Sequence, residues 1–213
     1  MNDNKLGVAI IEGAWSDEAK ELAADIGEFE IDAFLDDGIL KEVPVIKALI
    51  GFWKTGITIK DRLFLRKVAS FIAASPGFTP QEVEQFVIEH WHDKNQAARL
   101  GAVVVVVLDK LDDLEKPVML AKVFAAFVRK RISYDAFRRL AQSVDLSSIQ
   151  DLKALAGEKV VPEEFAEPYP TGLVRSGFAH WILKANAIGS RIGQTAEIND
   201  LGRLFMRCVQ NDF

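Results

Sequence analysis

The densest cluster of potential metal ligands in the sequence is Glu89-His90-Trp91-His92-Asp93. Histidine nitrogens bind zinc, and helical zinc sites place two histidines at positions i and i+4 so that both face one ion. His90 and His92 are two positions apart, which turns them about 200° away from each other on a helix. The spacing therefore favours a structural role for His90 on an apolar face and an exposed position for His92. No metal ligand is predicted.

A second group that could hold a cation consists of the carboxylates Asp109, Asp112, Asp113 and Glu115. Carboxylate oxygens bind magnesium and calcium. This group lacks the D-x-D-x-D-G loop and the distant glutamate of an EF-hand. The pattern is more typical of a solvated helix end.

Two further features could carry chemistry. Gly189-Ser190-Arg191-Ile192-Gly193 has glycines that could surround an anion, although a hairpin turn has the same composition. Cys208 lies in an apolar helical pattern, which indicates a small core residue rather than a thiolate nucleophile. Phosphate-loop, nucleophile-elbow, zinc-protease and C-x-x-C motifs do not occur in the sequence. We therefore predict no catalytic residue and no cofactor.

The better functional candidate is a basic and aromatic segment, residues 41–67. Its part from Val43 to Ile59 is amphipathic on a helical wheel, with aliphatic residues and Trp53 on one face and two lysines on another. This stretch is unsuited to crossing a bilayer, which needs about 20 apolar residues. Core packing, a partner-protein groove and contact with an anionic membrane surface all fit the pattern. The predicted interaction surface consists of Lys47, Phe52, Trp53, Lys54, Arg62, Arg66 and Lys67.

Charge is distributed unevenly along the chain, whose net charge is −5. Residues 1–40 hold two lysines and eleven carboxylates, whereas residues 41–67 hold seven basic and two acidic groups. Opposite charges attract within a Debye length of about 8 Å, so we predict that the acidic arm 1–40 folds back across the basic amphipathic segment and masks it. Apolar contacts of Leu22, Ile26 and Phe29 would supply most of the stability. Nucleic acid is disfavoured as a partner, because the basic groups are few and the acidic arm would repel phosphate.

The composition favours a cytoplasmic protein. A single cysteine cannot form an intramolecular disulfide, and the first residues lack the basic region and apolar run of a secretory signal. We predict a cytoplasmic location, either free or peripheral at the inner face of a membrane.

The elements that position these residues are predicted to be helices. Thr58-Ile59-Lys60-Asp61 and Thr79-Pro80-Gln81-Glu82 have the spacing of capping boxes, and Ser133 is a further N-cap. The five valines from Val103 to Val107 fit a strand or a buried helix, and the length of the surrounding pattern favours the helix. Residues 17–35 are predicted to form an amphipathic helix.

The predicted fold class is mainly α, with a multi-helix, bundle-like body of about seven or eight helices over residues 1–157. Three prolines predict a loop over residues 158–172. Residues 173–213 have short apolar runs between glycines and then a helical pattern, which predicts a small α+β element, a hairpin plus a helix, packed on the body.

The function class predicted from these features is a non-enzymatic intracellular interaction or regulatory protein that presents helical surfaces to a protein partner. Two alternatives stay open. One is a peripheral membrane-surface effector that uses residues 43–67, with an anionic membrane surface as its partner. The other is an enzyme whose carboxylates are too scattered to form a recognisable signature.

Overall fold

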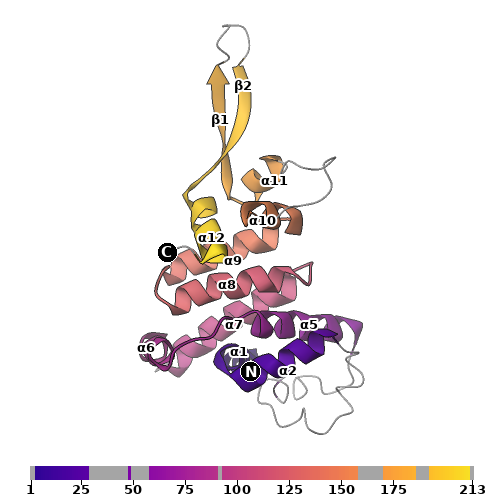
Figure 1. Ribbon diagram of the computed structural model, residues 1–213, viewed down its shortest axis with the longest axis vertical. Coiled ribbons are helices and arrows are strands. Elements are labelled where there is room, and N and C mark those ends of the chain that lie inside the picture. Colours follow the sequence, from indigo (N-terminus) through magenta and orange to yellow (C-terminus); the bar gives the residue numbers. More distant parts are fainter. Residues whose placement is uncertain are drawn as a thin grey trace. The chain divides into compact units, whose positions relative to one another are not determined.

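The structure is a computed structural model that describes residues 3–28, 48, 58–90, 93–157, 170–185 and 192–211. Within these ranges, ten helices and one two-stranded antiparallel sheet make up most of the chain (Figure 1). The predicted fold class, mainly α with a small C-terminal hairpin and helix, is confirmed. The chain divides into two compact units, residues 1–131 and 132–213.

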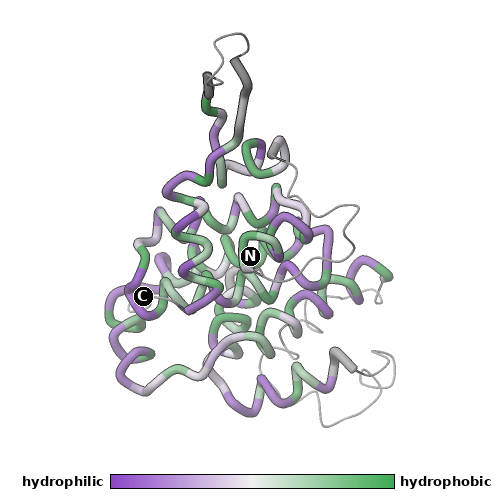
Figure 2. Tube along the Cα trace, turned by 45° about the horizontal axis from the view of Figure 1, so that its top comes forward, coloured by the Kyte–Doolittle hydropathy of each residue, from purple (hydrophilic) through white to green (hydrophobic). Residues whose placement is uncertain are grey.

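Unit 1 contains the described helices α1 (Asp3–Trp15), α2 (Asp17–Glu28), α5 (Ile59–Ala73), α6 (Pro80–His90), α7 (Lys94–Lys110) and α8 (Lys116–Val128). Helix α1 packs against α7, α2 packs against α5, and α8 packs against α5 and α6. Hydrophobic and hydrophilic residues alternate along the amphipathic helices (Figure 2), because each of them buries one face. Helix α8 differs, since nearly all of its side chains are buried.

Helix α1 was not predicted from the sequence. It crosses α7 where Gly7 meets Gly101: a Cβ atom on Gly7 would lie 2.3 Å from the carbonyl carbon of Gly101. Leu6, Ile10 and Ile11 of α1 are buried in the core. Residues 3–15 are therefore an integral part of unit 1 rather than part of a detachable arm.

The predicted helix starts are confirmed by hydrogen bonds. At α5 the Thr58 side chain accepts from the backbone N–H of Asp61, and the Asp61 carboxylate accepts from that of Thr58. At α6 the Glu82 carboxylate accepts from the backbone N–H of Thr79 at 2.8 Å, and Thr79 Oγ1 accepts from that of Glu82 at 3.2 Å. Each box satisfies two N–H groups that the first helical turn leaves without partners.

The run of five valines lies inside α7 and is helical, so the alternative of a strand is wrong. Ala97, Leu100, Val104 and Leu108 are buried along one stripe, and Val106 is exposed. The packing of this stripe outweighs the low helix propensity of β-branched residues.

Unit 2 contains α9 (Tyr134–Leu146), α10 (Ile149–Leu155), α11 (Pro170–Arg175), β1 (Ala179–Ala185), β2 (Ile192–Ile198) and α12 (Asp200–Gln210). The strands pair antiparallel, from Ala179 opposite Ile198 to Ala185 opposite Ile192. Pro170 and Gly172 were placed in the predicted loop but belong to α11. Proline is favourable in the first turn of a helix, where its missing N–H has no intrahelical partner. Residues 158–169 of that loop lie outside the described residues.

Candidate functional site

The predicted interaction surface is described only in part. Lys47, Phe52, Trp53 and Lys54 lie outside the described residues. Arg62, Arg66 and Lys67 lie on α5, the helix that begins at Ile59. The structure therefore brings the last three predicted residues onto one helix.

The cations of α5 have different surroundings. Lys67 Nζ donates to the backbone carbonyl of Asp109 at 2.9 Å, and Lys60 Nζ lies 3.7 Å from Asp109 Oδ1. These two lysines thus join α5 to the C-terminal end of α7, where a cation is favourable because of the helix dipole. Arg62 is half-buried, whereas Arg66 is exposed. Of the three predicted residues on α5, Arg66 is the most accessible to a partner.

Two large apolar side chains are exposed on the same helix. Ile59 is 78% exposed and Leu63 is 44% exposed. They are four residues apart, and Arg66 follows Leu63 by three, so the three side chains share one face of the helix. The opposite side of α5 is buried, with Phe64, Val68 and Phe71 in the core of unit 1. We call Ile59, Leu63 and Arg66 the outer face of α5.

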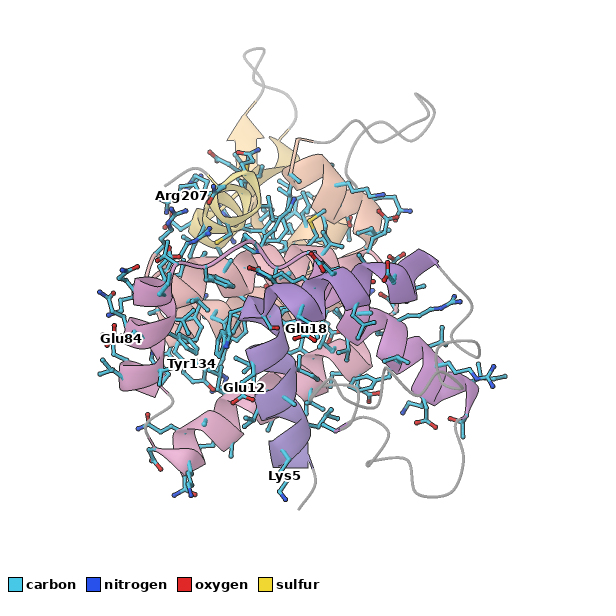
Figure 3. All side chains as sticks on the ribbon, turned by 60° about the horizontal axis from the view of Figure 1, so that its bottom comes forward. Lys5, Glu12, Glu18, Glu84, Tyr134 and Arg207 are labelled. Atoms are coloured by element: carbon cyan, nitrogen blue, oxygen red, sulfur yellow. The ribbon has the colours of Figure 1, made fainter. Side chains whose placement is uncertain are left out.

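The acidic N-terminal region contacts α5 through apolar residues. Ala19 and Ala23 of α2 are buried and Leu22 is half-buried, while Ile26 and Phe29 are not among the described side chains. Glu12 on α1 and Glu18 on α2 are exposed (Figure 3). Helices α1 and α2 thus pack on α5, whose residues 59–67 belong to the basic segment. The predicted masking of the whole segment 41–67 by residues 1–40 stays a hypothesis, because most of the segment lies outside the described residues.

The carboxylates at the end of α7 have structural partners. Asp112 Oδ1 lies 2.5 Å from Nζ of the buried Lys116, and Asp113 Oδ1 accepts from the backbone N–H of Glu115 at 2.7 Å. The hydrogen bond from Lys116 holds the pKa of Asp112 below its usual range. Among the described residues, no group of three His, Cys, Asp or Glu side chains is arranged to hold a metal ion.

His90 packs between aromatic rings. Its ring centroid lies 5.2 Å from that of Phe86 and 4.9 Å from that of Phe127. Burial lowers the pKa of His90, and the Glu89 carboxylate, 3.9 Å from its Nε2, partly opposes this effect. These contacts place His90 on the apolar side of α6, as the sequence predicts, and its structural role stays a prediction. His92 lies outside the described residues.

Sequence reasoning missed a set of cations around the loop before α6. Arg129 donates to the Glu82 carboxylate at 3.1 Å and to the Gly77 carbonyl at 2.9 Å, and its guanidinium lies 5.5 Å from the Phe78 ring centroid. Lys20 Nζ lies 5.7 Å from the same centroid. These residues are far apart in sequence, so no local pattern could have shown the arrangement.

Comparison of the chain with protein-family models, with curated proteins and with solved structures found no match. No helix in the described part of the chain is long and apolar enough to cross a membrane.

Proposed function

We propose that the protein is a non-enzymatic interaction protein of the cytoplasm that presents the outer face of α5 to a partner protein. The observation that supports this proposal is the exposure of Ile59 and Leu63 one helical turn apart. A single exposed apolar side chain is ordinary on a soluble protein, whereas neighbouring ones beside an arginine resemble the composition of interface centres.

The charge on the outer face of α5 suggests the chemistry of the partner. Arg66 is exposed one helical turn from Leu63. An apolar ridge that carries a carboxylate beside it would bury Ile59 and Leu63 while pairing with Arg66. A partner surface of this kind, such as an acidic amphipathic helix, fits the outer face best.

The test compares partner capture by the full-length protein and by a variant carrying Ile59→Gln and Leu63→Gln. Glutamine keeps the helix propensity of α5, and both side chains are exposed, so the variant should fold normally. Proteins retained from an extract of the source cell are quantified for each form. We expect the retention of at least one partner to fall about tenfold or more in the variant. Losses of this size are typical when side chains at the centre of an interface are truncated.

The matched control is Ile88→Gln. Ile88 is an exposed isoleucine on α6 of the same unit, 61% accessible, and it does not belong to the outer face of α5. This variant should retain the partner as well as the wild type does. Equal loss in both variants, or no loss in either, would contradict the proposal. Binding of the wild type to anionic liposomes without any protein partner would favour the membrane alternative instead.

A further inference from the structure

The β-hairpin of unit 2 is anchored at its base by packing and by hydrogen bonds. The Asn199 side chain donates to the Gly177 carbonyl at 2.9 Å, and the backbone N–H of Asn199 donates to the Phe178 carbonyl at 3.0 Å. Phe178 and Phe205 are fully buried, with ring centroids 4.9 Å apart. An isolated two-stranded hairpin is only marginally stable, so these contacts are what hold the base of β1 and β2 in place.

Beyond this base, β1 is exposed to solvent. Ala179 is buried, but the next two residues of β1, His180 and Trp181, are exposed, and Trp181 is 43% accessible. Figure 1 shows the two strands extending away from the helices of their own unit. Within the described residues the sheet has these two strands alone. Each strand therefore has an outer edge with no third strand beside it in the part of the chain that the structure describes.

The register of the hairpin shows which backbone groups lie on those outer edges. In an antiparallel ladder, pairs of residues that exchange hydrogen bonds alternate with pairs whose N–H and C=O groups point away from the partner strand. The bond from the Asn199 N–H to the Phe178 carbonyl makes these two residues a hydrogen-bonded pair, so the next pair, Ala179 and Ile198, points outward. Trp181 is two residues beyond Ala179, so its backbone N–H and C=O also lie on the outer edge of β1.

The two edges differ in how they are protected from another chain. On β2, Nη1 of Arg203 donates to the outward carbonyl of Ile198 at 2.6 Å, and the neighbouring Glu197 is exposed. Charged side chains of this kind hinder the pairing of an edge strand with a further strand. The stretch of β1 from Ala179 to Leu183 contains no Asp, Glu, Lys, Arg or Pro. The edge of β1 thus lacks the residues that normally protect an edge strand.

This edge of β1 is complementary to itself. Like charges directly opposite each other destabilise a pair of strands, and two copies of residues 179–183 bring no Asp, Glu, Lys or Arg side chains together. The exposed Glu197 stands opposite His180 within the same hairpin, on the far side of β1 from this edge. An acidic or basic partner segment would meet no opposite charge on residues 179–183. Pairing with a second copy instead joins two ribbons into a four-stranded sheet, and an independently stable sheet needs three or more strands.

We propose that β1 pairs antiparallel with β1 of a second copy of the chain, with Trp181 of both copies in the paired stretch. The two-fold axis of such a dimer passes through the new strand pair, so each copy contributes the same edge. The outward N–H and C=O groups of Trp181 gain hydrogen bonds there, and its exposed ring is covered by side chains of the second copy. This edge belongs to unit 2 and the outer face of α5 belongs to unit 1, so the inference does not depend on the function proposed above.

The test measures the mass of the full-length protein by sedimentation equilibrium at concentrations from about 1 to 100 μM. We expect the mass to rise from that of one chain, 23.7 kDa, towards twice that value. Each copy has a net charge of −5, so two copies repel each other, and added salt screens this repulsion. Dimerisation through an uncharged strand edge should therefore hold or strengthen as salt is raised, whereas an interface of ion pairs would weaken.

Two substitutions act on the edge of β1 itself. Leu183→Pro removes an N–H that points outward like that of Trp181, and it leaves the hydrogen bonds between β1 and β2 in place. Trp181→Lys puts a positive charge on the paired stretch of each copy. We expect each substitution to weaken dimerisation at least about tenfold, because a symmetric dimer carries it twice.

The matched control is Gln194→Pro. Gln194 stands opposite Leu183, and its N–H points outward from the edge of β2, so this variant should dimerise within about twofold of the wild type. Circular dichroism checks folding, and Trp181→Lys carries the test if Leu183→Pro does not fold. A mass of one chain up to about 100 μM would overturn the proposal. Equal loss of the dimer in Gln194→Pro, or unchanged dimerisation of folded Trp181→Lys, would overturn it as well.

Discussion

Nζ of Lys116 lies 2.5 Å from Oδ1 of Asp112, and the two side chains have very different exposure. The Lys116 side chain is 1% exposed, whereas that of Asp112 is 78% exposed. One member of the ion pair is therefore buried at the start of α8 and the other is in water. Removing Asp112 and removing Lys116 should lower the free energy of unfolding by different amounts, because only the removal of Asp112 leaves a charged group in the interior.

We predict that Asp112→Ala destabilises the protein by about 2 kcal/mol or more, because it removes a carboxylate beside a buried ammonium group. Lys116→Met should cost less, about 1 kcal/mol or below, since methionine fills a similar volume and Asp112 stays hydrated. Urea unfolding monitored by circular dichroism measures both free energies. A larger loss for Lys116→Met than for Asp112→Ala would contradict this account of the pair.

The crossing of α1 and α7 predicts that Gly101→Ala lowers the free energy of unfolding, whereas the same substitution in an isolated helix would raise helix stability. Gly101→Ala would place a Cβ atom 2.8 Å from the carbonyl carbon of Gly7, which is too close for two backbones that cannot give way. Overpacking of this kind costs about 1–3 kcal/mol. An isolated helix would instead gain about 1 kcal/mol from the same substitution. Destabilisation in a urea titration would therefore support the close crossing, and stabilisation would rule it out.

Gly77→Ala is the control for this prediction. No atom lies within 4 Å of the Cβ position at Gly77, which is in the loop before α6. The substitution should be neutral, or stabilise the protein by up to about 1 kcal/mol, through lower entropy of the unfolded chain. A loss as large as that of Gly101→Ala would show that glycine replacement in general, rather than the helix crossing, is responsible.

The sequence was sufficient to predict the helices and the hairpin wherever residues close together in the chain determine them. The capping boxes at Thr58 and Thr79 mark helix starts because their hydrogen bonds join residues three apart. The hairpin and the last helix were also predicted, since short apolar runs between glycines are followed by a helical pattern. The helical state of the valine run was predicted from the length of the surrounding apolar pattern, which is longer than a typical strand.

Features that depend on distant parts of the chain could not be predicted. Helix α1 is stabilised by close packing on α7 at Gly101, and nothing in residues 3–15 alone indicates that contact. The structural role of Lys67 depends on the Asp109 carbonyl at the end of another helix. Lys67, which the sequence places in the interaction surface, therefore joins α5 to α7. The described part of the candidate surface is centred on Ile59, Leu63 and Arg66.

Arg129 is predicted to fix the loop before α6. It joins the Glu82 carboxylate, the Gly77 carbonyl and the Phe78 ring, so Arg129→Met should lose several contacts at once. We expect a loss of about 1–2 kcal/mol and faster amide hydrogen exchange at the start of α6. Lys130→Met is the comparison, because the Lys130–Glu89 ion pair is half exposed and such pairs contribute about 0–1 kcal/mol. Equal effects of the two substitutions would show that Arg129 has no special role.

The packing of His90 predicts a pH dependence of stability. Burial against Phe86 and Phe127 lowers the pKa of His90 from its usual value of about 6.5. The Glu89 carboxylate partly opposes this effect, and Lys130 lowers the pKa by a smaller contribution. Between the lowered pKa and about 6.5 the unfolded chain binds more protons at this site than the folded one, so stability falls as pH falls through that window. Above it the full contribution is present.

The variant His90→Phe keeps an aromatic ring between Phe86 and Phe127 and removes the titratable group. Urea midpoints of the wild type and the variant are measured from pH 7.5 to pH 5, about the range in which histidine titrates. The two midpoints should diverge as the pH falls, because the variant loses less stability. The pKa values of Glu82 and Asp112 are also lowered, but these carboxylates lose their stabilising charge only at more acidic pH and are present in both forms.

His90→Gln separates loss of charge from ring packing, since it should flatten the pH profile equally while lowering stability at every pH. Parallel profiles for the wild type and both variants would show that His90 keeps the same proton affinity in the folded and unfolded states.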